Sequence, residues 1–128
     1  MKILIVEDEP ASLKLAHLVL SCDGHEVTQA EAVNQAVEQI YRAEPEVILL
    51  DLELPMINGL DLARRLKADT EKSHIVIIAV TCFPERYPPE QALAAGCDAY
   101  IVKPINTRNL GAQVAGVVGR LNMDGNDV

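Results

Sequence analysis

The sequence predicts a single doubly wound α/β domain built on a five-stranded parallel sheet. Short β-branched runs alternate along the 128 residues with longer segments of helical periodicity. Two of these runs, 47–50 and 75–80, are apolar at every position, which is typical of strands covered by helices on both faces. Parallel strands joined by right-handed crossovers account for the whole pattern.

The strands are expected where β-branched and other apolar residues cluster without helical spacing. Such runs are short, and each is followed by a polar residue or a turn signal. The expected strands are Ile3–Val6, Glu26–Thr28, Val47–Leu50, Ile75–Val80 and Ala99–Val102.

The intervening helices are marked by their ends. Pro10 opens the first helix and Gly24 follows its end, the usual asymmetry of these two residue types. The second carries one apolar stripe from Val33 to Ile40. The remaining helices are expected from Asn58-Gly59, from Pro89 to Ala95, and from about Thr107 to Leu121.

Composition restricts the class of partner and the compartment. The net charge of −8 repels polyanions, so direct binding to nucleic acid is not expected. No apolar run reaches the roughly 20 residues that a membrane helix needs, and the acidic start is unlike a signal peptide. We expect a cytoplasmic domain over residues 1–121, followed by a flexible tail at 122–128. Both a stand-alone protein and the N-terminal domain of a larger one fit this organisation.

Polar residues follow four of the expected strands at the point where each strand ends. The first strand delivers Glu7 and Asp8, the third Asp51, the fourth Thr81 and the fifth Lys103. In an open parallel sheet the carboxyl ends of the strands share one edge, and ligands bind there. These five side chains are therefore expected to meet, although they lie far apart in the chain.

Three carboxylates at one edge need a counter-charge. Two unit charges about 4 Å apart interact by about 4 kcal/mol at an effective dielectric constant near 20, so a divalent cation is expected beside Asp51. Mg²⁺ takes carboxylate, water and phosphate oxygens. Lys103 adds a positive charge for phosphate, and Thr81 a hydroxyl donor. An acid, a metal and a lysine around Asp51 predict a carboxylate that attacks phosphorus and becomes an acyl phosphate.

Several segments and their spacing carry a specific resemblance. They are "ILIVEDE", "VILLDLELPMINGLDL", "VIIAVT" and "ALAAGCDAYIVKPI". Over residues 2–121 the chain resembles a response-regulator receiver domain of the CheY-like superfamily. The resemblance implies a flavodoxin-like fold with the strand order 2-1-3-4-5.

The resemblance also implies roles for the acidic residues. Asp51 matches the phosphoacceptor, and Asp8 the residue that binds Mg²⁺ directly. Glu7 matches an acid that helps to bind the metal through water. The main-chain carbonyl of Glu53 matches a further metal ligand.

The remaining matches belong to the switch. Thr81 corresponds to the switch hydroxyl, and Tyr100 to an aromatic residue whose ring turns inward on phosphorylation. Lys103 corresponds to the family lysine, and Pro104 follows it through what is normally a cis bond. The positions of Glu53 and Phe83 influence how water reaches the acyl phosphate in this family.

A signalling switch is therefore the predicted function, not a turnover enzyme. A sensor histidine kinase or a histidine phosphotransfer protein would donate a phosphoryl group to Asp51. The face formed by the fourth helix, fifth strand and fifth helix would then bind a downstream target. Two alternatives are a pseudo-receiver that binds partners without phosphorylation, and a phosphatase with an aspartyl-phosphate intermediate. The order of the acidic motifs and the lack of a substrate cap oppose the phosphatase.

Two segments depart from the family pattern. Pro84, Pro88 and Pro89 predict a fourth helix that starts late, after a stiff loop. The last helix contains Gly111, Gly116 and Gly119, each costing roughly 1 kcal/mol relative to Ala. Close approach of a partner, including a second copy in a homodimer, would explain these glycines. A marginal helix without a partner is the alternative.

Overall fold

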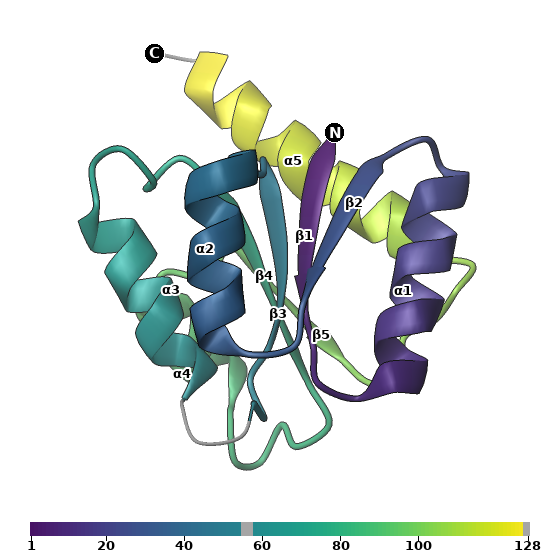
Figure 1. Ribbon diagram of the computed structural model, residues 1–128. Helices are drawn as coiled ribbons and strands as arrows, with labels where there is room; N and C mark the ends of the chain where they lie inside the picture. Colours follow the sequence, from purple (N-terminus) through teal and green to yellow (C-terminus); the bar gives the residue numbers. More distant parts are fainter. Residues whose placement is uncertain (55–57, 127–128) are drawn as a thin grey trace.

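A computed structural model describes residues 1–54 and 58–126, with the backbone alone for 122–126. Five parallel strands form one sheet in the order β2-β1-β3-β4-β5, and five helices cover it (Figure 1). The predicted fold class and strand order are confirmed. The fold is flavodoxin-like, with a crossover helix between each pair of consecutive strands.

The elements alternate strictly along the chain. None of the helices in the described ranges is long and apolar enough to cross a bilayer. The strands are β1 (Lys2–Val6), β2 (Glu26–Ala30), β3 (Val47–Asp51), β4 (Val76–Thr81) and β5 (Ala99–Val102). The helices are α1 (Pro10–Cys22), α2 (Val33–Ala43), α3 (Gly59–Ala68), α4 (Pro89–Ala94) and α5 (Leu110–Asn126).

The sheet separates two hydrophobic cores. Helices α2, α3 and α4 lie on one face, and α1 and α5 lie on the other (Figure 1). Leu4 and Ile48 belong to the first core, whereas their chain neighbours Ile3 and Leu49 belong to the second. Because successive strand side chains point to opposite faces and both faces are covered, the strands must be apolar throughout. This explains the continuous apolar runs in the sequence.

Strand register brings the carboxyl ends of the strands to one edge. Val6 pairs with Leu50, so the residues after them lie side by side. Asp51 pairs with Val80, and Thr81 pairs with Val102. The residues that follow β1, β4 and β5 are therefore gathered around the last residue of β3.

The bounds of α4 and α5 can be compared with those predicted from the sequence. Helix α4 begins at Pro89, as predicted from the proline-rich loop before it. Helix α5 begins at Leu110 instead of Thr107, and a turn precedes it in which the Asn106 side chain accepts the N–H of Arg108 at 2.9 Å. The α5 backbone continues to Asn126, beyond the expected end at Leu121. Whether 122–128 acts as a flexible tail stays a prediction, and residues 127–128 lie outside the described range.

The amino ends of β4 and β5 are tied to α3 by one side chain. The Lys67 ammonium donates to the carbonyl oxygens of Ser73 at 3.1 Å and Ile75 at 2.9 Å. It also pairs with Asp98 at 3.2 Å, and the same carboxylate accepts the N–H of Ile77 at 2.9 Å. The half-buried pair thus joins the starts of two adjacent strands.

One of the helix glycines has an explanation within the chain. A Cβ at Gly111 would collide with the carboxylate of Asp23, which follows the end of α1. A Cβ at Gly116 or Gly119 would meet nothing within 4 Å. The Asp23 side chain thus occupies the space beside Gly111, while a partner at Gly116 and Gly119 stays a prediction.

Gly59 allows α3 to start directly against β3. A Cβ at this position would lie 2.9 Å from the Asp51 carbonyl oxygen and 3.3 Å from the Leu52 Cα. Gly59→Ala should lower the free energy of unfolding by about 1–3 kcal/mol, since backbone must move. Gly116→Ala, in open space within α5, should instead raise it by up to about 1 kcal/mol. Urea denaturation of both variants measures the difference, and equal effects would contradict this account.

Candidate functional site

A buried ammonium group lies between two carboxylates from different strands. The Lys103 Nζ donates to the Glu7 carboxylate and lies 3.3 Å from Asp51 Oδ2. The Lys103 side chain is 11% exposed, and those of Glu7 and Asp51 are 5% exposed. The Lys103 main-chain N–H donates to the Thr81 carbonyl oxygen at 2.8 Å, which fixes the lysine at the end of β4. Asp51 therefore finds its positive partner on another strand.

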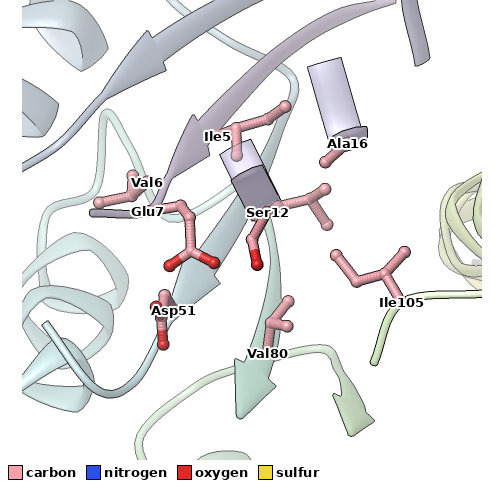
Figure 2. Close-up of a pocket in the computed structure, with 9 residues that line it drawn as sticks. Ile5, Val6, Glu7, Ser12, Ala16, Asp51, Val80 and Ile105 are labelled. Carbon is pink, nitrogen blue, oxygen red and sulfur yellow. The ribbon is translucent and has the colours of Figure 1, made fainter. Parts of the chain in front are cut away.

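An acidic cluster surrounds the same carboxylate. Glu7, Asp8 and Asp51 each offer one oxygen, and these oxygens all lie within 4.8 Å of one another. Figure 2 shows the Glu7 and Asp51 carboxylates directed into one space, with Ser12 beside them. Glu7 Oε2 is buried and has no hydrogen-bond partner among the described residues. Buried polar atoms are rarely left unsatisfied, and an all-oxygen set of this kind suits a hard divalent cation.

The acids at the end of β1 are not consumed by helix capping. Glu9 is the N-cap of α1, and its carboxylate accepts the N–H groups of Ser12 at 2.6 Å and Ala11 at 3.2 Å. These hydrogen bonds, led by that from Ser12, hold the pKa of Glu9 below its ordinary value. Because Glu9 satisfies the helix end, the preceding Glu7 and Asp8 remain available to the cluster.

The Glu53 side chain reaches from the segment after β3 to the carboxyl end of β4. Its Oε1 accepts the Thr81 hydroxyl, the Cys82 N–H at 2.9 Å and the Phe83 N–H at 3.2 Å. The Glu53 N–H in turn donates to Asp51 Oδ1 at 2.9 Å. Two roles expected for Glu53, a metal ligand through its main-chain carbonyl and an influence on water access to the acyl phosphate, stay predictions.

Burial and mutual repulsion shape the titration of these groups. Burial, followed by the neighbouring Glu7, raises the pKa of Asp51. Burial and then Asp51 raise the pKa of Glu53. Burial alone would lower the pKa of Lys103, but its contacts with Glu7 and Asp51 outweigh this and raise it. The ammonium is thus firmly charged, and the carboxylates around it remain in excess.

The structure brings together most of the predicted site residues, with Tyr100 apart from them. The Tyr100 hydroxyl donates to the Tyr87 carbonyl oxygen, and its partly buried ring packs on the core beneath α4. Burial is the main reason that the pKa of Tyr100 is raised. The Lys103–Pro104 peptide bond is cis. The gathered residues are Glu7, Asp8, Asp51, Glu53, Thr81 and Lys103.

Some contributors to the site were not predicted. Ser12, in the first turn of α1, lines the pocket with Glu7 and Asp51 (Figure 2). The N–H groups of Cys82 and Phe83 contribute through the backbone, a role distinct from the influence on water access expected of the Phe83 position. Only their position directly after Thr81, at the end of a predicted strand, could have identified them.

Comparison with known proteins identifies the family. Residues 3–115 match the family model of the response regulator receiver domain. The chain belongs to this family. It is 36% identical over 104 residues to the polar-differentiation response regulator DivK of Brucella ovis, covering 81% of this chain and 85% of the relative. Receiver domains are switches of two-component signalling that work with histidine kinases and downstream targets, and they are not classical enzymes.

Solved receiver domains share the architecture. A CheY-like receiver domain protein from Methanospirillum hungatei superposes with a TM-score of 0.87 at 28% identity, covering 96% of this chain and 97% of the other. The receiver domain of a sensor histidine kinase from Pseudomonas aeruginosa superposes with a TM-score of 0.82 at 30% identity, covering 92% and 97%. That second structure holds a magnesium ion coordinated in its active-site cleft.

The raised pKa of Asp51 makes a prediction about stability and pH. Since the native pKa lies above that of the unfolded chain, the contribution of Asp51 is fully present below the ordinary carboxyl pKa of about 4 and is lost as pH rises through the native pKa. In metal-free buffer, Asp51→Asn should therefore gain free energy of unfolding over wild type as pH rises. Glu38→Gln, in an exposed ion pair with Arg42, should follow wild type at all pH values. Urea titrations across pH measure this, and parallel curves for wild type and Asp51→Asn would refute it.

Proposed function

We propose that this receiver domain is a phosphorylated switch whose phosphoacceptor is Asp51. The observation that carries the proposal is the buried Lys103 ammonium held between Asp51 and Glu7, with Asp8 completing an acidic cluster. The acidic cluster of Glu7, Asp8 and Asp51 outnumbers the one ammonium in contact with it, which a purely structural ion pair would not require. A carboxylate that must accept an anionic group needs positive partners, and Lys103 supplies one.

The chemistry follows from the position of each group. An oxygen of Asp51 bonds to phosphorus as the phosphorus–nitrogen bond of a phosphohistidine donor breaks, and that electron pair stays with the imidazole. Lys103 remains beside the new acyl phosphate and pairs with a phosphoryl oxygen. The domain thereby assists its own phosphorylation, and the same groups serve its hydrolysis.

Magnesium is the proposed cofactor because the site offers only oxygen ligands. Asp8 and Asp51 would bind it directly, Glu7 through water, and Glu53 through its main-chain carbonyl. When bound, the ion neutralises charge on the carboxylates and the phosphoryl oxygens. Glu7 Oε2, which is buried and finds no hydrogen-bond partner in the described part of the chain, supports this assignment, as does the magnesium in the Pseudomonas aeruginosa receiver domain.

The output is a change of surface. Phosphorylation adds about −1.5 to −2 charges by analogy with other side chains. Thr81 and Lys103 respond to this charge, and Tyr100 relays the change to the face formed by α4, β5 and α5. We propose a cytoplasmic sensor histidine kinase or histidine phosphotransfer protein as donor, and a protein that binds this face as target. A second copy bound at the Gly116 side of α5 is a further candidate partner.

Phosphoryl transfer can be tested directly. With Mg²⁺ and acetyl phosphate, wild type should gain the mass of one phosphoryl group, and Asp51→Asn should gain none. Asp61→Asn removes an exposed carboxylate on α3 and should be phosphorylated like wild type. Intact-protein mass spectrometry reads all three. A wild type that gains no phosphoryl mass from any donor with metal in excess would leave the pseudo-receiver as the remaining interpretation.

Metal binding has its own test. Asp8→Asn should abolish measurable Mg²⁺ binding or weaken it more than Glu7→Gln does. Glu7→Gln should weaken it by about 10–100-fold, as expected for a residue that acts through water. Glu9→Gln changes a neighbouring carboxylate that caps α1, and it should keep the wild-type affinity. Titration followed by the amide signals of Asp51 and Leu52 gives the three affinities, and equal values for Glu7→Gln and Glu9→Gln would remove Glu7 from the site.

A further inference from the structure

Three hydrogen-bond donors beside Asp51 already hold an anionic oxygen that belongs to the protein. The Thr81 hydroxyl and the N–H groups of Cys82 and Phe83 converge on Glu53 Oε1. The Phe83 N–H lies 2.9 Å from the Thr81 hydroxyl oxygen as well, so the donors form one compact set. Successive backbone N–H groups with a hydroxyl at the end of a strand are a typical seat for a negatively charged oxygen.

This seat adjoins the phosphoacceptor. Sheet register places Asp51 opposite Val80, the residue before Thr81. The Glu53 N–H donates to Asp51 Oδ1 at 2.9 Å, so the backbone of Glu53 lies against Asp51 while its carboxylate reaches the donors. A phosphoryl group on Asp51 would present its oxygens to the same three donors. The carboxylate and the phosphoryl oxygen cannot both use them.

Burial of the Glu53 carboxylate is unfavourable in free energy unless the hydrogen bonds to its Oε1 offset it. Its Oε2 is buried and without a hydrogen-bond partner among the residues that the structure describes. Its charge also faces Asp51 in a pocket where carboxylates outnumber ammonium groups. Burying a carboxylate oxygen without a partner is unfavourable, so the three contacts through Oε1 must compensate for it.

We propose that the Glu53 carboxylate is an internal substitute for the phosphoryl group, which holds the Thr81–Phe83 donors in place until an incoming phosphoryl group displaces it. The inference rests on the proposed function, since the displaced position is the one beside a phosphorylated Asp51. Glu53 acts through the donors that it occupies and is therefore a positioning residue. It raises the threshold for phosphorylation and keeps the start of the β4–α4 loop ordered in the unphosphorylated chain.

Two consequences distinguish this role from a simple loop anchor. The Cys82 and Phe83 amides should be hydrogen-bonded before phosphorylation, and they should change acceptor without becoming free when the phosphoryl group arrives. Removal of Glu53 should free the Cys82 amide and leave the Phe83 amide with the Thr81 hydroxyl oxygen as its one acceptor. It should also make the anion bind more tightly, because nothing has to be displaced. A side chain that merely anchored the loop would weaken anion binding when removed.

The test compares Glu53→Ala with Glu53→Gln, which keeps the size and an acceptor oxygen but removes the charge. Amide spectra are first recorded without metal or phosphodonor, and Mg²⁺ with beryllofluoride, a mimic of the phosphoryl group, is then titrated in. In Glu53→Ala the Cys82 and Phe83 amide signals should shift strongly, and beryllofluoride should bind about tenfold more tightly than to wild type, the equivalent of one charge-assisted hydrogen bond. Glu53→Gln should keep these amides near their wild-type positions and gain less affinity.

Three outcomes would overturn the proposal. They are unchanged Cys82 and Phe83 amides in Glu53→Ala, an affinity for beryllofluoride no greater than that of wild type, and an equal gain in Glu53→Gln, which would reduce the effect to charge repulsion. Failure of the proposed function would be detected separately, by mass spectrometry, as a wild-type protein that gains no phosphoryl mass. The metal-free amide comparison does not depend on that result.

Discussion

The contact on which this structure depends is the Lys103 ammonium buried between Glu7 and Asp51. It joins the carboxyl ends of β1 and β3 to that of β5, which β4 separates from them in the sheet. Removing Lys103 would leave Glu7 and Asp51 buried without this counter-charge, and an uncompensated buried charge destabilises a protein by about 3–5 kcal/mol. The strands place these charges at one edge of the sheet. The Lys103 ammonium there offsets the repulsion between the Glu7 and Asp51 carboxylates.

Even so, the balance of charge at this edge is incomplete. Burial raises the pKa of both Asp51 and Glu53, and within residues 1–54 and 58–126 one oxygen of Glu7 has no hydrogen-bond partner. A fold optimised only for stability would not gather these carboxylates in one pocket. The excess negative charge is what a divalent cation can compensate, in keeping with the magnesium proposed for this site.

Periodicity and strand ends predicted most of the fold and the site. The continuous apolar runs required a sheet covered on both faces, and the polar residue after each strand located Glu7, Asp51, Thr81 and Lys103. These positions follow from topology, because parallel strands end at a shared edge. Late initiation of α4 followed from proline chemistry alone.

Other features depend on directions that no sequence period specifies. Glu53 lies in the irregular segment after β3, where alternation no longer fixes which way a side chain points. Any of three consecutive acids could cap α1, and the sequence does not distinguish Glu9, the observed N-cap, from Glu7 and Asp8. Helix α5 continues past Leu121 because glycine lowers helix propensity without forbidding the helix.

The half-buried contact of Lys67 with Asp98 has a mechanical consequence for this domain. It clamps β4 and β5 at their starting ends, where the carbonyl oxygens of Ser73 and Ile75 are also held. A movement of β4 or β5 at its starting end would have to break these contacts. The carboxyl ends of the two strands, where Thr81 and Lys103 lie, are outside the clamp.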